Sequence, residues 1–136
     1  MNERSKELIK EQNRTIPQVL ADHFELPVFQ DNINNDEVPP DHNYFLVVYG
    51  DISRSENQKA TGRHLSQDIY VVYLSENNDE VDENCIDIIT LLEEVKAISF
   101  QRTTKERVQK AETSEYVDRV TLIFSRMIKY ERSVSI

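Results

Sequence analysis

Glycine and tryptophan are scarce in this chain of 136 residues, which has two glycines, Gly50 and Gly62, and no tryptophan. Phosphate-binding loops and dinucleotide-binding turns need several closely spaced glycines, because the backbone must approach the phosphates without side chains in the way. Neither pattern can be written with two glycines so far apart. The sequence therefore contains no recognisable motif for nucleotide binding or hydrolysis.

Cysteine and long apolar runs are also scarce. Cys85 is the sole cysteine, so the chain cannot form an internal disulfide, and a reducing compartment is the simpler assumption. The first residues lack the apolar core of a signal peptide, and no run approaches the roughly 20 apolar residues that a membrane-spanning helix needs. We therefore expect a soluble protein that is made in the cytoplasm and does not bind membranes.

Positive charge is the third shortage, since 16 Lys and Arg face 25 Asp and Glu and the formal net charge is −9. Residues 1–97 carry 8 basic and 20 acidic side chains, whereas residues 98–136 carry 8 and 5. Phosphate backbones repel an acidic protein, which disfavours nucleic-acid binding. The asymmetry suits copies that pack head to tail, although a surface that only keeps the protein soluble explains the composition equally well.

Two helices are predicted. Apolar residues recur at helical spacing from Leu8 to Phe24. Pro17 interrupts this pattern and Thr15 can act as an N-cap, so we expect either one kinked helix or two short ones that meet near residues 13–14. The second helix is expected from Asp79 to Lys96, where acidic side chains crowd the first turn and favour the positive end of the helix dipole.

The strands are predicted from apolar runs. Continuous apolar and aromatic residues at 44–49 and 69–74 are typical of strands buried on both faces. Pro27 cannot donate to a strand ladder, so its short strand belongs at a sheet edge. The predicted strands are residues 26–29, 44–49, 69–74, 98–109 and 116–130. The sequence thus predicts a single domain, residues 1–136, of the α+β class, with a mostly antiparallel four- to five-stranded sheet and two helices packed on it.

Two polar segments, residues 30–43 and 52–67, read as surface loops. Within the second, residues 53–66 offer almost no apolar area to offset the entropy of fixing the backbone. We expect them to become ordered only against a partner, and an ordinary solvated hairpin loop is the alternative.

Candidate catalytic and metal-binding residues form no pattern. Cys85 falls on the apolar face of the second helix, where a thiol behaves as a small buried hydrophobe. The acidic run 79–84 lacks the alternating ligands and central glycine of a calcium loop, and helix-start electrostatics explains it without a metal. We expect no enzyme activity, metal or cofactor. An enzyme with an unfamiliar site would show a pocket joining two or more of His23, His42, His64, Asp68 and Glu76.

Basic residues on the last two strands offer a candidate protein-binding surface. They lack the glycines and paired aromatic residues of a nucleic-acid site, so a solvated face or an acidic protein partner explains them better. We predict that Arg107, Lys110, Arg119 and Arg126 of one copy face Asp79, Glu80, Asp82 and Glu83 of a neighbouring copy.

The order of elements resembles that of the tail terminator, or head-to-tail joining, proteins of long-tailed (siphovirus-type) bacteriophages. The resemblance covers nearly the whole chain and includes the local phrases Leu26-Pro27-Val28-Phe29, Tyr73-Leu74-Ser75-Glu76 and Phe124-Ser125-Arg126. It rests on element order rather than on a catalytic motif. A neighbouring neck or head-completion protein is the alternative within phages, and a cytoplasmic protein-binding module is the alternative outside them.

The resemblance implies a structural virion protein that forms a ring, usually a hexamer, on the finished tail tube. Such a ring ends tube polymerisation and presents a surface to the head connector. Its partners would be further copies of itself, the major tail tube protein and the head-completion or connector protein. It would be made in the bacterial host's cytoplasm and reside in the virion, at the tail end near the neck. An acidic lining would let DNA pass without adhering.

Overall fold

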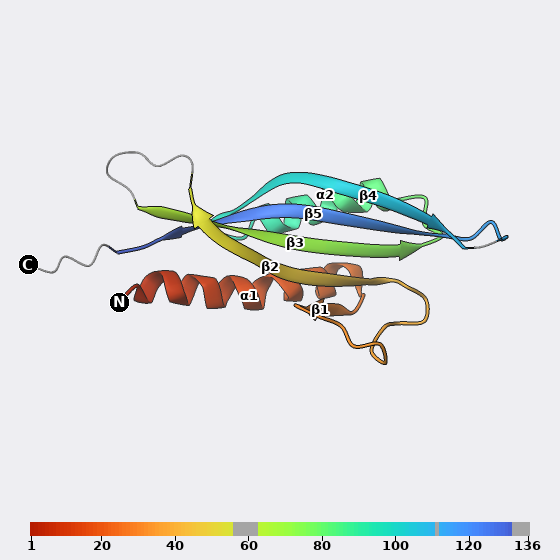
Figure 1. Ribbon diagram of the computed structural model, residues 1–136, viewed down its shortest axis with the longest axis horizontal. Helices are drawn as coiled ribbons and strands as arrows, with labels where there is room; N and C mark the ends of the chain where they lie inside the picture. The colour runs from red at the N-terminus through yellow and green to blue at the C-terminus, as the bar shows by residue number, and fades with distance from the viewer. Residues whose placement is uncertain (56–62, 111, 132–136) are drawn as a thin grey trace, which may run out of the picture.

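The computed structural model describes residues 1–55, 63–110 and 112–131. Its elements are α1 (Glu3–Phe24), β1 (Val28–Gln30), β2 (Tyr44–Arg54), β3 (His64–Glu76), α2 (Val81–Glu93), β4 (Ile98–Gln109) and β5 (Tyr116–Lys129). They form a five-stranded sheet in the order β1-β2-β3-β5-β4 (Figure 1). β1 runs parallel to β2, and every other neighbouring pair is antiparallel. The predicted α+β class and mostly antiparallel sheet are confirmed.

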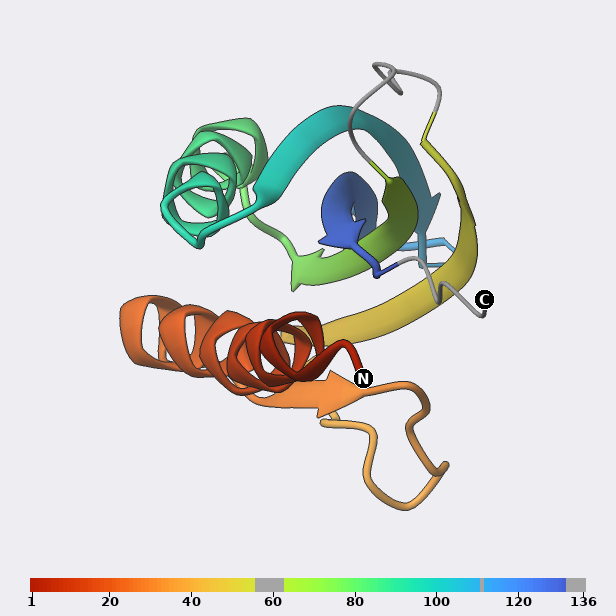
Figure 2. The same ribbon diagram turned by 90° about the vertical axis from the view of Figure 1, so that its left-hand side faces the viewer.

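Both helices lie on the same side of the sheet (Figure 2). Their apolar stripes meet the strand residues of one parity, because successive side chains of a strand point to opposite faces. At the centre the rings of Phe45 and Tyr73 stack with centroids 4.9 Å apart. The buried apolar core comprises Ile16, Leu20, Phe45, Val47, Ile69, Val71, Tyr73, Val81, Cys85, Ile88, Leu92, Ile98, Val120, Leu122 and Phe124.

The first helix is continuous, with Pro17 inside it, which agrees with the predicted alternative of a single helix. The alternative of two short helices is wrong, and Thr15 lies within the helix rather than at an N-cap. Ile16 and Leu20 on either side of the proline are fully buried. The packing of this stripe outweighs the local cost of proline, which removes one main-chain hydrogen bond.

β2 and β3 are longer than the apolar runs that predicted them. Their pairing continues through polar residues to Arg54 opposite Leu65, past an irregularity between Tyr49 and Ile52. The predicted loop 52–67 is therefore too long at both ends, because ladder hydrogen bonds hold polar residues that hydropathy cannot identify as strand. Residues 56–62, the centre of the segment expected to order only against a partner, lie outside the described residues.

No helix of the described residues lies on the second face of the sheet. Leu46, Val48 and Tyr70 lie on this face and are half-buried, whereas Val72 and Ile123 are 5% and 7% exposed. The helices thus cover only one face of the strands that were predicted to be buried on both faces, although Val72 and Ile123 on the second face are also buried. The half-buried Leu46, Val48 and Tyr70 remain partly accessible for contact with another protein.

Candidate interaction surfaces

One end of the sheet gathers charged side chains from β4, β5 and the start of α2. Arg107 donates two hydrogen bonds to Asp118, from Nε to Oδ1 at 2.8 Å and from an Nη to Oδ2 at 3.0 Å. Its guanidinium also lies 4.0 Å from the ring centroid of Tyr116. The hydrogen bond to Asp118 raises the pKa of Arg107. Because the Asp118 side chain is fully buried, Arg107 is fixed within its own chain.

Two lysines at this end are also paired. Lys110 forms an ion pair and hydrogen bond with Glu76 and lies 3.9 Å from Glu115, and the bond to Glu76 raises the pKa of Lys110. Lys105 on β4 contacts Asp82 on α2, with 3.1 Å between Nζ and Oδ1. These pairs join the hairpin to α2 and β3 of the same chain.

The acidic residues predicted to meet a neighbouring copy are therefore divided. Asp82 pairs with Lys105, and Asp79 accepts a 2.7 Å hydrogen bond from the Tyr116 hydroxyl, which raises the pKa of Tyr116. Glu80 and Glu83 are exposed, and their side chains contact no cation of the described residues. Among the residues predicted to bind a neighbouring copy, only Glu80, Glu83 and Arg119 have side chains that form no ion pair or hydrogen bond with another described residue.

Arg126 is the clear correction among the predicted surface residues. It is 3% exposed, on the helix-packed face of the sheet. Its guanidinium donates to Gln67 Oε1 at 2.9 and 2.7 Å, to Asn13 Oδ1 at 2.7 Å and to Gln12 Oε1 at 3.3 Å. It also lies 5.0 Å from the Tyr49 ring centroid. Burial lowers the pKa of Arg126, since it disfavours the charged form.

The sequence held a signal for this burial. The period-2 alternation that directs Phe124 and Ile128 inward also directs Arg126 inward. Charge alone suggested an exposed residue, and the two glutamines that satisfy it lie on α1 and β3, far from it in sequence. Because these partners are far from Arg126 in the sequence, no local sequence pattern could have identified them.

The residues named for an unfamiliar enzyme do not meet in one pocket. His64 and Glu76 occupy opposite ends of β3, while Asp68 lies between them. His23 on α1 is 3.9 Å from Asp87, and Glu76 is paired with Lys110. Burial raises the pKa of the Cys85 thiol to about 11, so it is protonated at neutral pH. Within the described ranges, no group of three or more His, Cys, Asp and Glu is placed to hold a metal ion.

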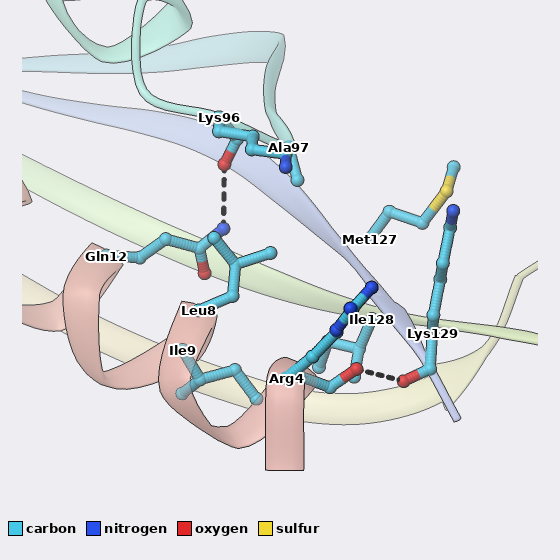
Figure 3. A pocket seen from close by; sticks show the side chains of 10 residues that line it. Arg4, Leu8, Ile9, Gln12, Lys96, Ala97, Met127, Ile128 and Lys129 are labelled. Atoms are coloured by element: carbon cyan, nitrogen blue, oxygen red, sulfur yellow. Dashed lines mark hydrogen bonds between the residues drawn. The ribbon is translucent and has the colours of Figure 1, made fainter. Parts of the chain in front are cut away.

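Figure 3 shows a pocket of about 310 Å³ at the end of the molecule where α1 begins and β5 ends. Leu8 and Ile9 of α1 form one wall, the α2–β4 connection at residues 96–97 a second, and Met127–Lys129 of β5 a third. Gln12 donates to the main-chain oxygen of Lys96 at 2.8 Å, and the Ser5 hydroxyl donates to that of Lys129. These bonds tie the walls together.

The pocket combines an apolar interior with a basic rim. Met127 is 48% exposed at the pocket and Ile128 is 8% exposed. Arg4, Lys96 and Lys129 also line it, with no carboxylate of the described chain within ion-pair distance of any of them. No acidic residue lines this pocket. In a chain of net charge −9, this is a positive site with an apolar floor.

Among the described residues, no helix is long and apolar enough to cross a membrane. No family model and no curated protein matches the chain. Among solved structures, it is similar to a chain from the virion of a native gene transfer agent (GTA) particle. The TM-score is 0.51 with 17% sequence identity, and the match covers 90% of this chain and 92% of that chain. At this identity the likeness establishes a shared fold.

Proposed function

We propose that the protein is a structural virion protein that forms a ring on the phage tail tube, ends its polymerisation and joins the tail to the head connector. The observation that carries this proposal is the fold shared with a chain from the virion of a gene transfer agent particle. The match spans nearly all of both chains, so it concerns the complete arrangement of helices and strands rather than one common motif. The resemblance of element order to tail terminators supports the specific part of the proposal, a position at the end of the tail near the neck.

The surfaces of the chain support a role in assembly. A ring subunit must contact its two neighbours and also the structures above and below it. This chain offers an apolar sheet face without a helix, a basic pocket with an apolar floor, and exposed carboxylates at the start of α2. Separate surfaces of different chemistry are what several simultaneous partners require. The proposed role needs no catalytic group, metal or cofactor.

The test is deletion of the gene from the phage that encodes it, followed by electron microscopy of the lysate. We expect the lysate to contain heads without tails and free tails of variable, excessive length. Supplying the wild-type gene should restore normal tail length and the attachment of tails to heads. A complementing gene with Ile88→Asp should fail, because it places a charge in the core.

Other results would select another role. Uniform tails that only fail to attach to heads would refute tube termination and indicate a neck or head-completion protein. Normal infectious particles from the deletion strain would refute a structural role and favour a cytoplasmic binding module.

A further inference from the structure

The outer face of α2 complements the pocket at the end of the molecule. Ile86 on this face is 64% exposed although the neighbouring Ile88 is fully buried. Asp82 and Glu83 lie one turn before Ile86 and share its side of the helix, because residues three and four apart lie on one face. Asp87 follows Ile86 and lies about 100° further around the helix axis. The face thus presents one branched aliphatic side chain among carboxylates.

A single exposed isoleucine carries no meaning alone, since scattered apolar residues are normal on protein surfaces. Ile86 becomes informative when it is compared with the pocket. Both surfaces combine aliphatic with charged side chains, and the charges on the two surfaces are opposite in sign. Leu8, Ile9 and Ile128 line the pocket together with Arg4, Lys96 and Lys129, whereas on α2 Ile86 shares its side of the helix with Asp82 and Glu83. The pocket volume of about 310 Å³ is roughly ten times the 30 Å³ that one water occupies in the liquid, which leaves room for an aliphatic side chain.

Most charges on the two surfaces are also available, and the exception is Asp82, which pairs with Lys105 of its own chain. Arg4, Lys96 and Lys129 have no ion pair in the described chain, and neither has Glu83. Asp87 has only His23 at 3.9 Å. The hairpin cations Arg107 and Lys110, in contrast, are held by carboxylates of their own chain. A contact between copies therefore has three unpaired cations at the pocket, whereas of the hairpin cations predicted to bind a neighbour only Arg119 is exposed and unpaired.

We propose that the α2 face of one copy docks in the pocket of a second copy, with Ile86 contacting Leu8 and Ile128. Arg4, Lys96 and Lys129 then face Glu83 and Asp87 of the other copy. Because the two surfaces are different patches of one chain, the contact is head to tail and can close into a ring. The inference rests on the proposed ring function and names the contact that builds the ring.

The test uses two purified full-length variants, each with one surface removed. Ile86→Asp places a carboxylate where the pocket needs an apolar anchor, while its own pocket is intact. Arg4→Glu with Lys129→Glu reverses the pocket rim, and Ser5 still bonds to the main-chain oxygen of Lys129. We expect each variant to self-associate at least about tenfold more weakly than wild type, as expected for loss of an apolar anchor or of several charge pairs.

Mixing the two variants is the decisive step. One intact pocket and one intact α2 face remain, so the mixture should form one-to-one heterodimers and nothing larger in sedimentation velocity and native mass spectrometry. Arg119→Glu and Ile52→Asp are the matched controls, because both residues are exposed and lie outside the two surfaces. They should associate like wild type.

Three results would each overturn the proposal: wild type that stays monomeric up to about 1 mM, Ile86→Asp that associates like wild type, or a mixture without heterodimers. Equal weakening by Arg119→Glu would point to the hairpin instead. Tail lengths in the deletion strain test the ring function separately. Overlong tails together with any of these results would reject only this contact.

Discussion

The buried guanidinium of Arg126 makes the stability of this fold depend on a neutral residue, Gln67. No carboxylate of the described chain pairs with Arg126, and Gln67 Oε1 accepts two of its N–H bonds at 2.9 and 2.7 Å. Gln67 in turn donates to the main-chain oxygen of Gly50 at 2.8 Å. We predict that Gln67→Met, which keeps the size of the side chain, is strongly destabilising because it leaves this charge buried with fewer acceptors.

The magnitude follows from the bonds lost. A hydrogen bond to a charged group contributes about 1.5–3 kcal/mol, and both bonds end on one oxygen, so Gln67→Met should cost about 3 kcal/mol. Arg126→Met removes the buried charge together with its partners' bonds and should cost about 2 kcal/mol, since only neutral amides are left unpaired. The double variant has no buried charge to satisfy. It should cost about 3 kcal/mol, which is about 2 kcal/mol less than the sum of the single changes.

Urea denaturation followed by circular dichroism measures these free energies of unfolding. The control is Gln18→Met, because Gln18 is exposed on α1 and bonds only to Asp22, and it should change stability by less than about 0.5 kcal/mol. Additive effects of Gln67→Met and Arg126→Met, or a cost of Gln67→Met as small as the control's, would show that the guanidinium does not depend on Gln67.

Two further predictions concern α2. Ile88 is fully buried, so Ile88→Ala should lower the free energy of unfolding by about 2–5 kcal/mol. Ile86 is 64% exposed, so Ile86→Ala should change it by less than about 0.5 kcal/mol. Similar urea midpoints for the two variants would contradict the packing described. Burial raises the pKa of Cys85 from 9.0 to about 11, so the folded state binds this proton more tightly than the unfolded state. Its contribution to stability is constant below about pH 9 and is lost as pH rises towards 11, by about 1.4 kcal/mol at pH 10. Cys85→Ala lacks this component, and an unchanged stability difference between wild type and Cys85→Ala at pH 8 and pH 10 would argue against a buried thiol.

The parts of the fold that the sequence predicted well are those in which apolar residues repeat with one period. The apolar stripe of the second helix consists of Val81, Cys85, Ile88, Ile89, Leu92 and Val95. Four of these are in the core, while Ile89 and Val95 are partly buried against it, and Val95 lies beyond the end of α2 at Glu93. β4 has the bounds predicted for it, residues 98–109, and β1 lies at the sheet edge, as Pro27 indicated. In each case a local rule and the tertiary packing favour the same structure.

Tertiary interactions explain the parts that were not predicted. Pro17 suggested a break, but burial of Ile16 and Leu20 maintains one helix across it. The polar ends of β2 and β3 pair because their neighbours bring them into register, which hydropathy does not encode. The pocket could not be predicted from local pattern, since its walls come from the beginning, the middle and the end of the chain.

The charge distribution limits how copies of this chain can associate. Two copies of net charge −9 repel one another, so a stable contact must place cations of one directly against carboxylates of the other. Arg107 and Lys110 cannot serve without first giving up carboxylates of their own chain, and Arg126 is inside the core. Exposed ion pairs contribute about 1 kcal/mol or less each, so charge alone does not hold such a contact and apolar burial has to accompany it. The pocket between α1 and β5 meets both conditions, because its unpaired cations surround an apolar floor.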